Sequence, residues 1–237
     1  MNKIPLLLIV IFVFLPISFA KDLDSVIIKK IDNFEIINAP LPFVVQSLSE
    51  NCKSQGVLIN FEEAVDPNKD KLLSFKFKDL SINDIVNKIL NDNKCYTWTS
   101  KNNIINIVPS NTNSNYILDQ VVGKIKVENK TRDEIVQLVL EELDKDNPGK
   151  YRIETDNNEI AYQLVVLNLP YKELGISPPI LTRHSFEFKN ETFRDVLNAI
   201  SKNENICWQI MLVDEKEGIR TLVFMDPSAG SGLQNIK

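Results

Sequence analysis

Three cysteines and one histidine are the residues of this 237-residue chain best suited to chemistry. Cys52, Cys95 and Cys207 lack the close paired spacing of zinc ligands, so they indicate thiol or disulfide chemistry instead. His184 is the one position for a histidine acid, base or nucleophile activator, and its sequence neighbours supply no partner. We therefore expect an exposed loop histidine, and we expect no catalytic residue, cofactor site or metal site.

The first twenty residues, "MNKIPLLLIVIFVFLPISFA", indicate an export signal. Lys3 precedes an apolar run, and small residues close it, which favours cleavage after Ala20 by a signal peptidase. An uncleaved anchor is the alternative, but the run is short for a spanning helix and contains Pro5 and Pro16. We expect a periplasmic or otherwise exported protein without an integral membrane segment after cleavage. The net charge of -5 argues against nucleic acid as a partner.

One phrase occurs twice in the chain: "SFKFKDLSINDIVNKI" at 74–89 and "SFEFKNETFRDVLNAI" at 185–200. Each copy has alternating apolar residues for a strand, a hydroxyl residue for a helix N-cap, and the spacing of an amphipathic helix. Ser81 with Asp84, and Thr192 with Asp195, fit the capping-box pattern. Fainter copies at 34–48 and 124–140 bring the number of strand–helix units to four.

A further strand is expected after each helix, and a closing hairpin after the second helix of each pair. The sequence thus predicts an α+β fold of two tandem βαββαββ modules, each a small mixed sheet with two helices packed on one face. The predicted boundaries are a signal at 1–20, a first module at 34–109, a linker at 110–120, a second module at 121–226 with an insertion at 156–184, and a flexible tail at 227–237.

The order of elements, the "FKDLSINDIV" phrase, the aromatic strand after it and the terminal "IINIVP" resemble the secretin and TonB short N-terminal domain. The resemblance covers 34–109 well and 121–226 less well, because the second copy lacks a proline at its first helix entry. It implies a periplasmic docking module that carries no catalytic residues and that sometimes forms rings. Members of this family usually precede a pore or a barrel segment, and no such segment follows here.

The cysteines leave two interpretations open. Aligning the modules pairs Cys95 with Cys207 and pairs Cys52 with a leucine, Leu143, which suggests that Cys52 faces the core. Cys52 and Cys95 could then form a disulfide beneath the paired helix ends, worth roughly 3 kcal/mol. Buried thiols are the equal alternative, and Cys207 could also pair between chains.

Partner docking is expected from two places. The apolar part of the insertion is one, since loops tolerate binding duties; its residues are Ile176, Pro178, Pro179, Ile180 and Leu181. Trp98 and Trp208, on the closing strands, are the other, with core packing as the more frequent role of such aromatics. An exposed terminal strand could also accept a partner strand at its edge.

The sequence favours a non-enzymatic docking or scaffold protein of the bacterial envelope, an accessory of a secretin-type secretion or pilus assembly or of a TonB-linked receptor. Its expected partners are envelope proteins, such as an outer-membrane pore or an inner-membrane regulator, and a homo-oligomer is compatible with the sequence. The alternatives are an exported hydrolase, or a periplasmic binder of a small ligand, that uses the cleft between the modules.

Overall fold

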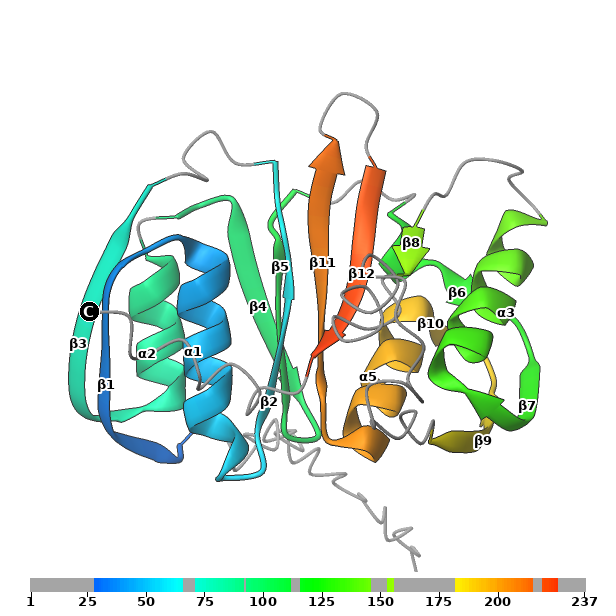
Figure 1. Ribbon diagram of the computed structural model, residues 1–237, viewed down its shortest axis with the longest axis horizontal. Coiled ribbons are helices and arrows are strands. Elements are labelled where there is room, and N and C mark those ends of the chain that lie inside the picture. Colours follow the sequence, from blue (N-terminus) through cyan, green and yellow to red (C-terminus); the bar gives the residue numbers. More distant parts are fainter. Residues whose placement is uncertain are drawn as a thin grey trace, which may run out of the picture.

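The computed structural model describes residues 28–65, 71–91, 93–111, 116–145, 153–155, 182–214 and 219–225. Within these residues the chain forms the predicted α+β fold (Figure 1). The predicted signal, most of the predicted insertion and the predicted tail lie outside them.

The first repeat follows the predicted order of elements. They are β1 (Lys30–Ala39), α1 (Leu41–Lys53), β2 (Leu58–Glu62), β3 (Leu73–Ser81), α2 (Ile82–Leu90), β4 (Tyr96–Lys101) and β5 (Ile104–Pro109). Strands β1 and β3 pair antiparallel and form a two-stranded sheet of their own.

The second repeat contains the same elements with short additions. They are the 3-10 helix η1 (Ile117–Asp119), β6 (Val121–Val122), β7 (Ile125–Thr131), α3 (Arg132–Asp144), β8 (Ile153–Thr155), β9 (Arg183–Phe188), β10 (Glu191–Thr192), α5 (Phe193–Glu204), β11 (Cys207–Asp214) and β12 (Ile219–Met225). Two predicted boundaries need correction. Ile117 and Leu118, placed in the linker, are buried in the second core, and Arg183 and His184, placed in the insertion, belong to β9.

The two repeats share one central sheet, which the sequence did not predict. Its six strands lie in the order β4-β5-β2-β11-β12-β8, so β2 of the first repeat is directly paired with β11 of the second. Helices α1 and α2 lie between this sheet and the β1–β3 pair, while α5 and α3 lie on its other side, toward the β7–β9 pair (Figure 1). The separate small sheets of the prediction are therefore wrong, and each helix pair is enclosed between two sheets.

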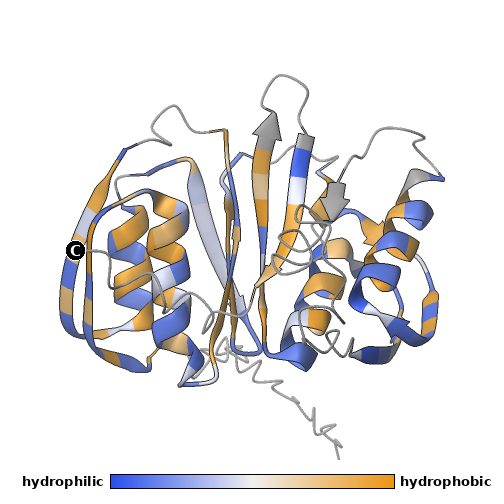
Figure 2. Ribbon diagram, viewed as in Figure 1, coloured by the Kyte–Doolittle hydropathy of each residue, from blue (hydrophilic) through white to orange (hydrophobic). Residues whose placement is uncertain are grey.

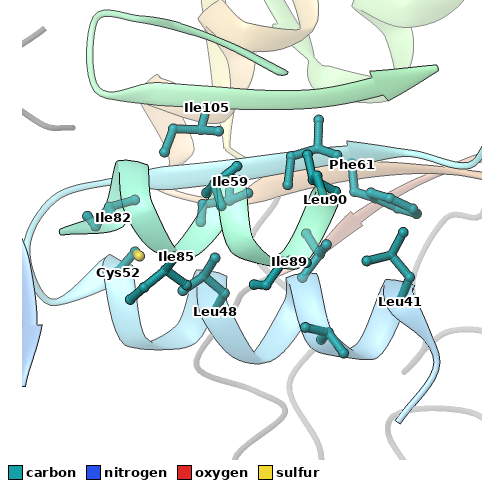
Figure 3. Close-up of a cluster of buried hydrophobic side chains, with 14 of the residues drawn as sticks. Leu41, Leu48, Cys52, Ile59, Phe61, Ile82, Ile85, Ile89, Leu90 and Ile105 are labelled. Carbon is teal, nitrogen blue, oxygen red and sulfur yellow. The ribbon is translucent and has the colours of Figure 1, made fainter. Parts of the chain in front are cut away.

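Each repeat has its own hydrophobic core, centred on its helices. In the first repeat α1 and α2 each carry an apolar and a polar side (Figure 2), and the apolar sides meet the inner face of β2 and β5. The helices run antiparallel: Cys52 lies beside Ile82 at one end of the layer, and Leu41 lies with Leu90 at the other (Figure 3). The second core is built in the same way and includes the fully buried Trp208.

All four strand–helix units turn at the same kind of residue. Asn38, Asp79, Asn129 and Asn190 have φ angles of 51°, 52°, 52° and 55°, and each stands two residues before the N-cap of its helix. Asn and Asp tolerate this left-handed conformation better than other residues with a side chain. The four units are thus related by a shared backbone geometry as well as by apolar spacing.

The repeated serine of the phrase supports this turn. Ser74 Oγ accepts a hydrogen bond from the Asn38 backbone N at 3.0 Å, and Ser185 Oγ accepts one from Asn129 N at 3.1 Å. In each repeat, the serine on the second strand of the outer pair therefore stabilises the left-handed turn at the end of the first strand.

The predicted N-caps are confirmed, but the full capping box forms at Thr192 and not at Ser81. Ser81 Oγ accepts from Asp84 N at 3.1 Å, and Thr192 Oγ1 accepts from Asp195 N at 3.1 Å in a capping box.

Phe188→Asp should unfold the second repeat. Phe188 is 5% exposed on β9, so an aspartate there places a charge in the core and costs roughly 4 kcal/mol. Thermal unfolding followed by circular dichroism measures the loss. Glu187→Asp, which places the same side chain on the exposed face of β9, is the control and should leave the transition in place. Equal transitions for the two variants would contradict the register of β9.

Candidate functional site

The junction between the repeats is a short parallel pairing of β2 with β11. Phe61 is opposite Gln209 and Glu62 is opposite Ile210. Two backbone amides extend this pairing: Glu63 N donates to the Ile210 carbonyl at 2.8 Å, and Leu212 N donates to Glu63 Oε2 at 2.8 Å. Strand β2 is therefore paired along both edges, with β5 on one side and β11 on the other.

A buried amide network crosses the junction. Asn60 is fully buried, its Nδ2 donates to Asn106 Oδ1 at 3.1 Å and to Asn198 Oδ1 at 2.9 Å, and its Oδ1 accepts from Trp208 N at 3.0 Å. Asn198 Oδ1 also accepts from Trp208 Nε1 at 3.1 Å. Because Asn60 reaches a strand and a helix of the second repeat, this network fixes the position of one repeat against the other.

A buried ion cluster lies at the end of β2. Glu62 is fully buried, with Arg220 Nη1 3.5 Å from its Oε1 and Arg194 Nη1 3.7 Å from its Oε2. Arg194 also pairs with Asp119 at 2.8 Å, and Arg220 donates to the carbonyl of Glu63 at 2.8 Å. One carboxylate of the first repeat is thus held by two guanidinium groups of the second.

Burial dominates the ionisation of Glu62. Loss of water raises its pKa from 4.5 to about 7, against the opposing effect of Arg194 and Arg220. Neither arginine reaches Glu62 Oε2 closely, and that oxygen has no hydrogen-bond partner among the described residues. The carboxyl group therefore takes up its proton close to neutral pH.

This cluster was hard to predict from the sequence. In "LINFE" the polar Asn60 and Glu62 alternate with Ile59 and Phe61, a pattern that normally indicates a strand with one solvent face. In the fold that face is covered by the second repeat. The signal that could have found it is the carboxylate of Glu62 inside a short strand whose other residues, apart from Asn60, are apolar.

A shallow cavity of about 260 Å³ opens where the repeats meet. It is lined by residues of both repeats: Lys101, Asn102, Ile104, Phe188, Glu191, Asp195, Asn198, Ala199 and Lys202. Lys101 Nζ lies 3.4 Å from Asp195 Oδ1, and Asp195 also accepts from the Thr192 hydroxyl at 2.7 Å. Burial acts to raise the pKa of Asp195, but the Thr192 hydrogen bonds and the Lys101 charge outweigh it, so this pKa is lowered. Asp195 is thus already engaged by the protein.

The expected exposed position of His184 is wrong. His184 is 3% exposed on β9, because this strand extends further toward its N-terminus than the predicted insertion allowed. Its Nε2 lies 2.6 Å from Glu204 Oε1, and its Nδ1 lies 2.6 Å from Asn203 Nδ2. Arg132 holds the other Glu204 oxygen at 3.2 Å. The histidine thus connects β9 to the end of α5 and is closed to a substrate.

The predicted pairing of Cys52 with Cys95 is not supported by the fold. The prediction assumed that the C-terminal ends of α1 and α2 lie together, but the helices are antiparallel (Figure 3). Cys52 is near the start of α2, whereas Cys95 follows its end and precedes Tyr96, which stacks on Phe61. The two cysteines therefore lie at opposite ends of the helix layer, and all three cysteines are present as thiols.

The residues predicted to dock a partner do not form one surface among the described residues. Trp208 is fully buried in the second core, so it cannot form a docking surface. Trp98 is half-buried against the first core, and its Nε1 donates to Asn87 Oδ1 at 2.9 Å. The five insertion residues, Ile176, Pro178, Pro179, Ile180 and Leu181, lie outside the described residues.

Strand β4 forms one edge of the central sheet and corresponds in the first repeat to β11 in the second. Its Thr97, Thr99 and Lys101 are exposed on the side facing away from the first core. Ser110 N donates to the Cys95 carbonyl at 2.8 Å, and bonded and non-bonded pairs alternate along an antiparallel ladder. The backbone groups of Trp98 and Ser100 therefore point to the outer edge of the sheet.

Comparisons with known proteins found no matching family model, curated protein or solved structure. Among the helices of the described residues, none has both the length and the apolar composition needed to cross a bilayer.

Glu62→Gln should change the pH dependence of folding. The Glu62 pKa is higher in the fold than in the unfolded chain, so stability from this group is complete below pH 4.5 and is lost as pH rises through about 7. The loss is roughly 3 kcal/mol at 1.36 kcal/mol per pKa unit. Urea unfolding at pH 4.5 and pH 7.5 should show a smaller decline in the variant than in the native protein. Glu187→Gln, on the exposed face of β9, is the control, and equal declines in all three proteins would contradict the assignment.

Proposed function

We propose that this protein is an exported, non-enzymatic docking scaffold of the bacterial envelope. In this proposal the two repeats are modules of the secretin and TonB short N-terminal type, which the sequence resembles, and they act as one rigid unit. The observation that carries the proposal is the junction: two repeats of one design are joined through a continuous sheet and buried polar contacts. Such a unit can present a partner with surfaces at a fixed separation and orientation.

The proposed docking site is the outer edge of β4 with its exposed face. In the second repeat the corresponding strand, β11, has its edge paired with β2, and its Cys207 contacts Ser49 of α1. In the first repeat β4 has no strand on its outer edge among the described residues, and Thr97, Thr99 and Lys101 are exposed. The outer edge of β4 thus corresponds to the edge of β11 that pairs with β2 at the junction, but without a strand in the place of β2 among the described residues.

This likeness indicates the form of the partner. Because β2 adds to β11 in parallel, we propose that an extended segment of another envelope protein adds to β4 in parallel. Backbone hydrogen bonds to Trp98 and Ser100 would supply affinity, and the threonines would supply a surface suited to β-branched neighbours. The Lys101 charge at the end of β4 disfavours uncontrolled edge pairing.

The alternatives have less support. A His184-based hydrolase conflicts with the burial of that side chain. A small-ligand binder is favoured by the cavity between the repeats, whose lining includes cationic and anionic groups. However, Lys101 and Asp195 there already pair with each other.

In-cell cross-linking from β4 tests the proposal. A photo-reactive phenylalanine in place of Thr99 should capture an envelope protein, and adding Ser100→Pro should remove the product. The proline deletes an outward-pointing N–H while leaving the β4–β5 hydrogen bonds intact. A cross-linked product that consists of two copies of this chain would indicate self-assembly in place of a separate partner.

The control variant is Ser100→Ala, which keeps the outward-pointing N–H and should retain the cross-linked product. The Ser100→Pro and Ser100→Ala proteins should have the same Tm as the native protein, which shows that the fold is retained. The protein recovered from the envelope fraction should begin at Lys21. An unchanged product from the Ser100→Pro protein would refute docking at this edge. A protein retained in the cytoplasm would refute the envelope assignment.

A further inference from the structure

We propose that Cys52 and Cys207, which are thiols in the structure, are oxidised during folding to a disulfide that ties the two repeats together across the junction. Both cysteines are buried, at 0% and 2% exposure, and they come from different repeats. Cys52 lies in the last turn of α1, and Cys207 begins β11. This bond would add a covalent link to the strand pairing and the buried polar contacts of the junction. It does not depend on which partner the protein binds.

The contact of Ser49 with Cys207 places Cys207 against the buried side of α1, which also carries Cys52. Ser49 Oγ lies 3.0 Å from Cys207 Sγ. Ser49 and Cys52 both belong to the buried side of α1, and side chains three residues apart on a helix have Cβ atoms about 5–6 Å apart. Cys52 therefore lies one helical step from the side chain that already contacts the Cys207 sulfur.

Sheet register brings Cys207 to the same end of the molecule. The Cys52 carbonyl accepts from Val57 N at 3.2 Å, so Cys52 is next to the start of β2. Continuing the register from Phe61 opposite Gln209 by two residues places Cys207 opposite Ile59, also near the start of β2. Both cysteines are thus located where the parallel pairing begins.

Cys95 is poorly placed for a disulfide with Cys52 or with Cys207. It precedes β4, which β5 and β2 separate from β11 in the sheet, so it is about three strand spacings, roughly 14 Å, from β11. It also follows the C-terminal end of α2. Cys52, by contrast, lies beside Ile82 at the start of α2 (Figure 3). A bond involving Cys95 would require the sheet or the helix layer to come apart.

The oxidant is a disulfide compound, and the bond forms by two exchange steps. One cysteine thiolate attacks glutathione disulfide, giving a mixed disulfide and one glutathione thiol. The second cysteine thiolate then attacks the protein sulfur of that mixed disulfide and releases the second glutathione thiol. Two thiols of the protein are oxidised, one glutathione disulfide is reduced, and the two protons end on the glutathione products.

This chemistry belongs to folding rather than to the finished fold. Burial, together with the neighbouring Cys207, raises the pKa of the Cys52 thiol to about 12, so it is hardly ionised once packed. Exchange therefore proceeds while the chain is still folding, and the completed bond is then shielded from reductant.

Peptide mapping after oxidative refolding tests the proposal. The purified protein is unfolded, reduced, refolded in glutathione buffer, alkylated under denaturing conditions and digested with trypsin. The sequence places each cysteine in a separate tryptic peptide, at 31–53, 95–101 and 203–216. Mass spectrometry should find 31–53 linked to 203–216, with Cys95 alkylated. Reduction should lower the Tm by roughly 10 °C, as expected for a bond that closes so long a loop.

Three variants make the result decisive. Cys95→Ser should keep the linked pair, and Cys52→Ser should lose it. Ser49→Cys combined with Cys52→Ser moves the thiol to the position that contacts Cys207, so it should give a link from 31–53 to 203–216 under the same conditions. If this control links while the native protein is alkylated at all three cysteines, or links through 95–101, the proposal is wrong.

Discussion

The pairing of β2 with β11 is the interaction on which the rest of the structure depends. It brings Asn60 into hydrogen bonds with Asn198 and Trp208 of the second repeat, and it buries Glu62 completely. A buried carboxylate is tolerated only with compensating charges, and Arg194 and Arg220 supply them from the second repeat. The polar groups of β2 therefore make separation of the repeats costly, because Asn60 and Glu62 would each lose their partners in the second repeat.

The same pairing makes the molecule directional. Two repeats are joined with the β2 edge of one against the β11 edge of the other, so the ends of the central sheet differ. Strand β4 is at one end and β8 is at the other. Among the described residues, this heterologous arrangement leaves the outer edge of β4 in the first repeat without a neighbouring strand, and the proposed docking site is that edge.

The sequence was most informative about local structure. Strands, capped helices and their fourfold recurrence could be predicted because Ser81, Thr131 and Thr192 act within a few residues of their partners. The left-handed Asn and Asp residues before each cap belong to the same local code. These features depend on neighbours in the chain, so a single sequence contains them.

Contacts between distant segments could not be predicted in this way. Asn60 and Glu62 alternate with apolar residues as they would on a solvent-facing strand, and only the arrival of α5 and β11 turns that face into an interior. His184 was misplaced because its partner, Glu204, lies at the end of a helix twenty residues later. Cys52 and Cys95 were misplaced because the relative direction of α1 and α2 is set by the sheets around them (Figure 3).

Amide hydrogen exchange at the junction tests the central claim most directly. The backbone N–H groups of Glu63 and Trp208 donate across the junction, to Ile210 and to Asn60 respectively. A continuous sheet predicts that both amides exchange as slowly as those in the cores of the two repeats. Exchange at these two positions as fast as at the exposed edge of β4, while the cores remain protected, would show that the repeats are separate bodies and would contradict this account.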